Sequence, residues 1–263
     1  VLLAMESIAV IPKTFKKKYT DKFDLTFTFL DDIVDNNRIF KINYSFDLEK
    51  EVGISFKDKT KFLCNFSSNK FSSHKNELYT KRIEAIEYYE NIEDNIFDLY
   101  GFGWDKSYSF PVIYDLVKGL QKYKLSRALV KTINSIPVKM NPFLKTYKCY
   151  QGSVNDKYEY LKKYKFSICY ENVSGVNGYI TEKIFDCFKN EVVPIYLGPD
   201  NIEDIIPKES FINRNNFSSE EEVFNYLNKI DESKYTELTN AGKSFLNSDK
   251  AKFFDSYETA KYI

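Results

Sequence analysis

The chain has 263 residues, of which 43% are hydrophobic, 29% charged and 17% aromatic, enough to bury the core of one large globular domain or two smaller ones. This composition excludes a disordered, collagen-like or membrane-spanning protein. The 38 basic and 38 acidic residues cancel to a formal charge of +0, so we expect no nucleic-acid partner. Recognition therefore has to come from local groups of side chains.

Short apolar runs open the chain and predict strands of an α/β layer. These runs are Val1–Met5, Leu25–Phe29 and Ile39–Ile42. The first is a strand already under way, so we expect a fragment or a chain whose upstream part is missing. The sequence shows neither a signal peptide nor an apolar run of about 20 residues, and an anchor would have to lie upstream.

A β-α-β unit follows the opening strands. Residues 59–67 predict a strand, residues 76–89 a helix with apolar side chains at helical spacing, and residues 96–100 a second strand before a glycine turn. After this unit, residues 115–148 carry eight basic residues against one acid, a net charge of +7. This basic segment predicts contact with an anionic membrane surface or an acidic substrate, or only the solvated face of an inserted helix, which is the commoner outcome.

The rest of the chain alternates strands and helices. We predict strands at 166–170, 192–198 and 211–213, and helices at 180–190, 201–206, 218–230 and 233–254. Such alternation indicates a mostly parallel sheet covered on both faces, which binds ligands beyond the carboxyl ends of its strands. The loop at 171–178 lies at such an end.

Histidine and cysteine usage excludes several kinds of site. The only histidine, His74, lies in a polar stretch, so paired-histidine zinc sites are impossible and a serine or cysteine triad has no obvious nucleophile. The four cysteines lack a Cys-x-x-Cys pair, and three lie among apolar neighbours as expected of core residues. Asp31, Asp32 and Asp35 could suggest a divalent metal, but they read as a solvated loop, and we expect no obligatory metal.

The helix predicted from Ile180 has one apolar face for the sheet, which leaves Glu182 and Lys183 in the first turn free to face the loop. A lysine in a first turn opposes the helix dipole unless an anion such as a phosphate binds there. Gly175 and Gly178 would allow the chain to approach such a ligand closely. An exposed Glu-Lys pair beside ordinary glycine turns explains the pattern equally well.

Three stretches, taken in order along the chain, resemble a known family. They are YKFSICYEN at 164–172, GYITEKIFD at 178–186 and PIYLG at 194–198, followed by IPKESFIN at 206–213. Together they closely resemble the donor-binding motif of the α1,3/α1,4-fucosyltransferases, glycosyltransferase family 10. A match over about 50 residues is much more specific than a short phosphate-loop pattern.

The resemblance implies a GT-B type α/β fold, in which two Rossmann-like domains face each other across a cleft. Residues 59–245 would form the donor-binding domain, with the basic insertion at about 105–150. Residues 1–58 would be the carboxyl-terminal part of a truncated acceptor-binding domain, and residues 246–263 a terminal helix.

The same resemblance implies an inverting transfer of L-fucose from GDP-β-L-fucose to a hydroxyl of a glycan acceptor, on an N-acetylglucosamine or glucose unit, in α1,3 or α1,4 linkage. The residues that bind the diphosphate do not contact the sugar, so an enzyme that uses another nucleotide sugar as donor is an alternative. A non-catalytic remnant that binds glycan or nucleotide also stays open. We expect a cytoplasmic or peripheral membrane enzyme, or a Golgi-lumenal one if an upstream anchor is missing.

Position by position, Asn172, Tyr179, Glu182 and Lys183 match the family residues that hold the GDP moiety. Arg82 matches the arginine that meets the diphosphate. Fixed cations at this place would stabilise the negative charge that gathers on the leaving GDP.

Two further carboxylates enter through the same resemblance. Glu6 matches the position of the base that takes the acceptor proton, although Met5 and Ser7 depart from the commoner pattern. Glu171 would contact the sugar, support the residues that bind it, or accept hydrogen bonds from nearby loop N–H groups.

Overall fold

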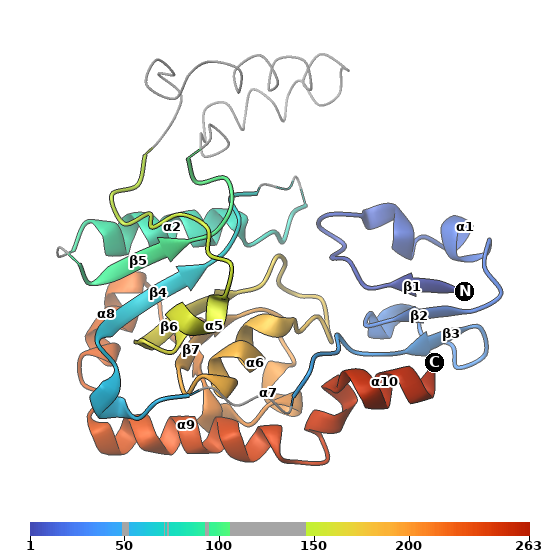
Figure 1. Ribbon diagram of the computed structural model, residues 1–263. Helices are drawn as coiled ribbons and strands as arrows, with labels where there is room; N and C mark the ends of the chain where they lie inside the picture. The colour runs from blue at the N-terminus through green and yellow to red at the C-terminus, as the bar shows by residue number, and fades with distance from the viewer. Residues whose placement is uncertain (49–52, 71, 73, 93–94, 106–145) are drawn as a thin grey trace.

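The computed structural model describes residues 1–48, 53–70, 72, 74–92, 95–105 and 146–263 (Figure 1). It shows two sheets side by side, each built of parallel strands, a small one of three strands and a larger one of five. The basic segment predicted at 115–148 lies almost entirely outside the described residues.

The small sheet has the strand order β1-β2-β3, and all its strands are parallel. They are β1 (Leu2–Ala4), β2 (Thr26–Thr28) and β3 (Ile39–Lys41), which confirms the three strands predicted first along the chain, each somewhat shorter. Its connections hold α1 (Lys17–Thr20) and the 3-10 turns Pro12–Phe15 and Asp31–Ile33. Phe29 lies at the centre of its core, where it contacts Phe15, Tyr44 and Tyr179.

The large sheet has the strand order β5-β4-β6-β7-β8, again all parallel. Its strands are β4 (Lys61–Phe66), β5 (Phe97–Tyr100), β6 (Tyr164–Tyr170), β7 (Val193–Leu197) and β8 (Ile212–Asn213). The chain runs from β4 to β5 on one side and then returns to place β6 on the other. The strand order therefore reverses between β4 and β6, and such a switch point is where parallel sheets bind ligands.

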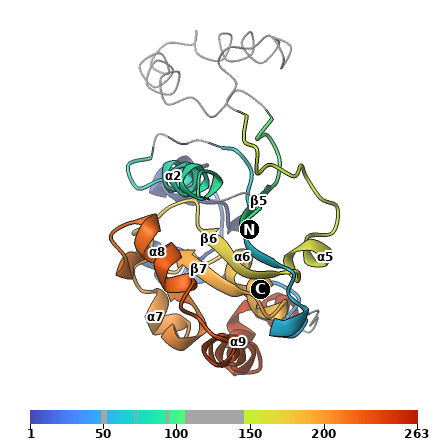
Figure 2. The ribbon, with the colours of Figure 1, turned by 90° about the vertical axis from the view of Figure 1, so that its left-hand side faces the viewer.

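Helices cover both faces of the large sheet, as the alternation of strands and helices predicts. Figure 2 shows α2 (Tyr79–Glu90) and α8 (Glu220–Leu227) on one side of the strands, and α5 (Lys157–Leu161) and α6 (Glu182–Lys189) on the other. The short α7 (Ile202–Ile205) adds Ile202 to the core on the α6 side. The predicted α/β class with two facing Rossmann-like units is confirmed.

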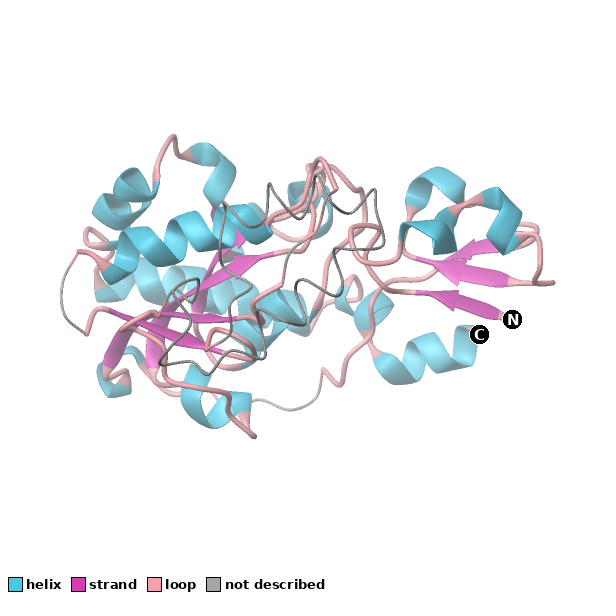
Figure 3. Cartoon of the chain, turned by 90° about the horizontal axis from the view of Figure 1, so that it is seen from above, coloured by secondary structure: helices cyan, strands magenta, loops and turns pink. Residues whose placement is uncertain are grey.

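The end of the chain differs from the single long helix predicted at 233–254. Helix α9 (Glu232–Leu246) stops at a polar turn, a 3-10 turn follows at Ala251–Phe254, and α10 (Ser256–Tyr262) starts where Asp255 accepts hydrogen bonds from two backbone N–H groups. Helix α10 returns to the small sheet, where Tyr262 contacts Phe27 (Figure 3). Within the described part of the chain, no helix is long and apolar enough to cross a membrane.

Candidate active site

A cleft of about 530 Å³ lies at the carboxyl ends of β4, β5 and β6, between the two units. Its large-unit wall is formed by the loops after these strands and the first turns of α6, and its small-unit wall includes Glu6 and Tyr44. All six site residues predicted from the sequence line this one cleft, namely Glu6, Arg82, Asn172, Tyr179, Glu182 and Lys183. The cleft therefore occupies the switch point between β4 and β6.

Arg82, on α2, is a buried cation with only 3% of its surface exposed. Its Nε and Nη2 donate to the carbonyl oxygen of Tyr170 at 3.0 and 2.7 Å, and Nη2 also donates to Oδ1 of Asn172 at 2.9 Å. Among the described residues it makes no ion pair with a carboxylate, and burial lowers its pKa below the ordinary value. A buried guanidinium without a counter-ion favours binding of an anion.

Asn172 and Tyr179 continue the hydrogen-bond chain from Arg82. The amide Nδ2 of Asn172 donates to the hydroxyl of Tyr179 at 3.0 Å, so this amide has its oxygen toward the arginine. The ring of Tyr179 packs on Phe29 and Tyr44 at the junction of the two units. Burial, with the nearby charge of Glu171, raises the pKa of Tyr179, so its hydroxyl stays protonated.

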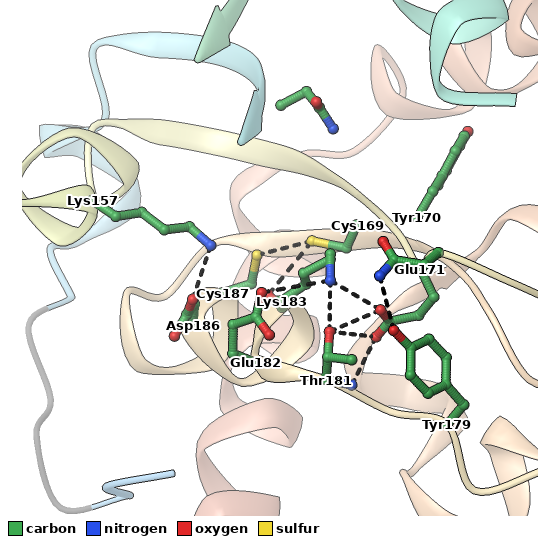
Figure 4. Close-up of polar contacts among 12 residues, drawn as sticks. Lys157, Cys169, Tyr170, Glu171, Tyr179, Thr181, Glu182, Lys183, Asp186 and Cys187 are labelled. Atoms are coloured by element: carbon green, nitrogen blue, oxygen red, sulfur yellow. Dashed lines mark hydrogen bonds and ion pairs between the residues drawn. The ribbon is translucent and has the colours of Figure 1, made fainter. Parts of the chain in front are cut away.

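Lys183 is held at the start of α6 by a buried carboxylate (Figure 4). Its Nζ donates to Oε2 of Glu171 at 3.0 Å and lies 2.6 Å from the hydroxyl of Thr181. Glu171 is 0% exposed, and it also accepts from the backbone N–H of Thr181 at 2.8 Å and from the hydroxyl of Tyr196 at 3.2 Å. Glu171 is therefore the partner of the Thr181 N–H and of Lys183, which fits two of the roles left open by the sequence, support of a binding residue and acceptance from a loop N–H.

Glu182 and Glu6 present carboxylates to the cleft from opposite walls. The side chain of Glu182 is 49% exposed. Partial burial raises the pKa of this carboxylate, but the positive charges of Lys183 and Lys157 have the larger effect and bring the pKa below its ordinary value. Glu6 follows β1 on the small unit and is exposed, and its Oε1 accepts from the backbone N–H of Ser7 at 2.8 Å. One carboxylate thus lies beside the predicted phosphate site and the other faces it.

The two glycines expected to admit a ligand have other roles. Gly178 has a φ of 78°, and a Cβ there would lie 2.7 Å from the carbonyl oxygen of Phe29, so its small size lets the loop approach the small unit. At Gly175 a Cβ would lie 3.1 Å from Nδ2 of Asn76. Neither glycine is among the residues that line the cleft, and close approach of a ligand at these positions stays a prediction.

Sequence reasoning missed Lys157 and Asp186, which also line the cleft. Lys157 is the first residue of α5, a helix of five residues that is too short for a periodic apolar pattern. Its start does carry a signal, because Asp156 accepts from the backbone N–H of Tyr158 at 2.9 Å as a helix N-cap. That signal locates the helix and gives no indication of its position at the cleft.

The acidic loop and the cysteines take structural roles. Asp31 pairs with Lys41 at 2.6 Å, and Asp35 accepts three backbone N–H bonds, which lower its pKa. Across the described ranges, no group of three or more His, Cys, Asp or Glu side chains is arranged to hold a metal ion. All four cysteines are free and buried, which includes the three expected to be core residues.

Comparison with known proteins supports the resemblance seen in the sequence. Residues 112–240 match the sequence model of "Glycosyltransferase family 10 (fucosyltransferase) C-term". The resemblance to glycosyltransferase family 10 is confirmed. The alpha-(1,3)-fucosyltransferase FucT of Helicobacter pylori is 35% identical to this chain over 114 residues, which are 42% of the chain and 23% of the relative. A mouse 4-galactosyl-N-acetylglucosaminide 3-alpha-L-fucosyltransferase 9 is 42% identical over 69 residues, 26% of the chain and 19% of the relative.

Solved structures share the fold. An α1,3-fucosyltransferase with GDP superposes with a TM-score of 0.51 at 16% identity, over 88% of this chain and 71% of that one. The Anabaena protein Alr3699/HepE in complex with UDP-glucose superposes with a TM-score of 0.57 at 12% identity, over 100% and 72% of the two chains. The sequence matches thus span less than a quarter of the relatives' length, while the fold extends over nearly the whole chain.

Proposed function

We propose that this chain acts in an inverting fucosyltransferase that moves L-fucose from GDP-β-L-fucose to a hydroxyl of a glycan acceptor, an N-acetylglucosamine or glucose unit, in α1,3 or α1,4 linkage. The observation that carries the proposal is the buried Arg82, which lines the same cleft as Lys183 and has no carboxylate partner among the described residues. Two cations that line one cleft suit a diphosphate. The confirmed family resemblance supports fucose as the transferred sugar.

In this proposal Arg82 and Lys183 bind the diphosphate and stabilise the charge that develops on it. When the bond between the fucose anomeric carbon and the diphosphate oxygen breaks, negative charge gathers on GDP, and fixed cations lower the energy of that transition state. An ammonium has three protons, and Nζ of Lys183 has Glu171, Thr181 and, in a long contact of 3.5 Å, Oε1 of Glu182 as partners. It can keep the first two partners and donate the third proton to a phosphate oxygen. The two side chains supply the cationic groups, and we expect transfer without an added divalent ion.

Glu6 is the proposed base. Its exposed carboxylate lies on the small-unit wall, where an acceptor sugar can approach the anomeric carbon from the side away from GDP. As the acceptor oxygen bonds to that carbon, its proton passes to Glu6 and the pair of electrons of the broken bond stays on GDP. Glu182, half exposed beside Lys183, is placed to accept hydrogen bonds from ribose hydroxyls.

We infer a cytoplasmic or peripheral membrane enzyme, with contact to anionic lipid through the basic segment at 115–148. An upstream anchor would instead allow a Golgi-lumenal location.

Calorimetric titration of GDP and GDP-fucose in buffer with EDTA tests the donor site. We expect binding that Arg82→Ala and Lys183→Ala each weaken by about 1.5–3 kcal/mol, because each removes a charge-assisted hydrogen bond. Lys81→Ala is the matched control, since Lys81 is the neighbour of Arg82 on α2 and its side chain is 55% exposed and paired with Glu84. A folded wild-type chain that gives no heat with either nucleotide would contradict the proposal.

Turnover separates the alternatives. Incubation with GDP-fucose, GDP-mannose and UDP-N-acetylglucosamine and a panel of N-acetyllactosamine and lactose acceptors, read by mass spectrometry, identifies the sugar transferred. Transfer from another nucleotide sugar would replace fucose in the proposal. Binding of GDP without transfer from any donor would indicate a non-catalytic nucleotide-binding protein.

A further inference from the structure

The cleft continues past the residues assigned above to an ion pair that the proposed function does not use. Nζ of Lys157 lies 2.8 Å from Oδ2 of Asp186, and the hydroxyl of Tyr158 donates to Oδ1 of Asp186 at 2.9 Å. The side chains of Lys157 and Asp186 are 29% and 10% exposed, and both line the cleft. Figure 4 shows the pair on one side of Lys183, with Tyr179 on the other.

The position of Asp186 on α6 relates this pair to the diphosphate site. Asp186 follows Glu182 by four residues, so the two carboxylates share one face of the helix and lie about 6 Å apart along its axis. Asp186 is thus within reach of the base of a nucleoside diphosphate that has its phosphates at Lys183 and its ribose at Glu182. Glu6, at the small-unit wall, is left to the sugar end of the donor.

We propose that Lys157 and Asp186 read the base of the donor nucleotide and select a 6-oxopurine such as guanine. This inference rests on the proposed function, because it takes the diphosphate to bind at Arg82 and Lys183. It names the two residues that would set the nucleotide specificity of the same cleft.

The chemistry of the pair fits the edge of guanine. Each carboxylate oxygen of Asp186 has one hydrogen-bond partner and a further lone pair, so the group can accept from the N1–H and the amino group of guanine. Lys157 donates one proton to Asp186 and has two more for the O6 carbonyl. Adenine offers an unprotonated N1 and an amino group at these places, which leaves the carboxylate facing a lone pair and the ammonium facing a donor.

The surroundings of the pair favour a bound, partly desolvated ligand. Nζ of Lys157 lies 5.6 Å from the ring centroid of Phe66, which also lines the cleft and stacks on Tyr100 at 4.6 Å. Burial lowers the pKa of Lys157, but Asp186 outweighs this and raises it above the ordinary value, so the ammonium stays charged. Donor and acceptor are thus both fixed before a ligand arrives.

The alternative is that the pair only ties α5 to α6. The two roles differ in what they do to nucleotides with the same phosphates, so binding of GDP, ADP and inorganic pyrophosphate should be measured for wild type, Asp186→Asn and Lys157→Met. Lys162→Met is the control, because Lys162 is the C-cap residue directly after the same helix and pairs with Glu159 rather than lining the cleft.

We expect wild type to bind GDP at least about 100-fold more tightly than ADP, and each variant to reduce this preference by about 10-fold or more. Pyrophosphate affinity should stay within about threefold, and the control should keep the wild-type preference. The thermal unfolding midpoint of each variant establishes that it is folded, and Lys157→Met carries the test if Asp186→Asn does not fold.

The inference is wrong if the preference for GDP over ADP is unchanged in folded variants, or if pyrophosphate binding falls as much as GDP binding. Wild type that binds pyrophosphate and both nucleotides equally also refutes it, and leaves the diphosphate site standing. Wild type that binds neither GDP nor pyrophosphate overturns the proposed function together with this inference.

Discussion

Replacing Glu171 by Gln tests how the first turn of α6 is held in place. The carboxylate accepts from Thr181, Tyr196 and Lys183 at 2.8 to 3.2 Å, and it has no exposed surface. An amide keeps one accepting oxygen but turns an NH2 group toward donors, so at least one buried donor loses its partner at about 1–3 kcal/mol, and the ammonium of Lys183 loses its counter-ion. We expect the free energy of unfolding to fall by about 3 kcal/mol.

Urea unfolding followed through the buried Trp104, the only tryptophan, measures the change. Glu182→Gln is the matched control, because its carboxylate is 49% exposed and its contact with Lys183, at 3.5 Å, is long. We expect this control to stay within about 0.5 kcal/mol of wild type. If Glu171→Gln unfolds at the same urea concentration as the control, the contacts of Glu171 contribute little and the reasoning is refuted.

Three further predictions concern other parts of the chain. Burial lowers the pKa of Lys59 from 10.5 to about 8; between these values the unfolded chain binds the extra proton, so stability from this residue rises with pH. The free energy of unfolding of Lys59→Met should therefore fall relative to that of wild type by up to about 3 kcal/mol as the pH rises from 8 to 10.5. If urea unfolding gives the same difference between the two proteins at both pH values, this prediction is contradicted. Gly101→Ala should lower the free energy of unfolding by at least about 2 kcal/mol, because φ is 128° and a Cβ would lie 2.7 Å from the carbonyl carbon of Ser67. Gly152→Ala is the control and should cost less, because its φ is 90° but a Cβ would meet open space. Thermal unfolding measures both. Glu6→Gln should keep GDP binding within about twofold and lower kcat for fucose transfer at least about 100-fold, and a wild-type kcat would remove Glu6 from the base role.

The sheets were predictable because their strands are short apolar runs bounded by polar or glycine-containing turns. β4, β6 and β7 are buried on both faces, and their sequences have few polar residues. Periodicity could not predict that Glu6, Arg82 and Lys183 line one cleft, because these residues are far apart in sequence. The family resemblance predicted it, because the residues of a family motif are known to lie together in the folded protein, which a local pattern does not show.

Other features depend on contacts that no local pattern contains. The pair of Lys157 and Asp186 joins two helices 29 residues apart in sequence, and α5 shows only a capping signal. The end of α9 at Leu246 rather than at Phe254 follows from polar residues that break a pattern otherwise consistent with one helix. These features appear only once the sheet has brought the helices together.

Lys183 shows how tertiary contact changes an electrostatic interpretation. From the sequence, a lysine in the first turn of α6 opposes the helix dipole, a pattern that a bound anion and an exposed Glu-Lys pair explain equally well. In the folded chain Glu171 already supplies a negative charge 3.0 Å from Nζ, so the dipole no longer requires a ligand. The case for an anion passes to Arg82, which is buried without a carboxylate partner among the described residues and which no helix-dipole consideration identifies. In the proposed donor site, Lys183 is positioned in advance by Glu171 and would add a directed donor, while the net attraction for phosphate would come mainly from the arginine.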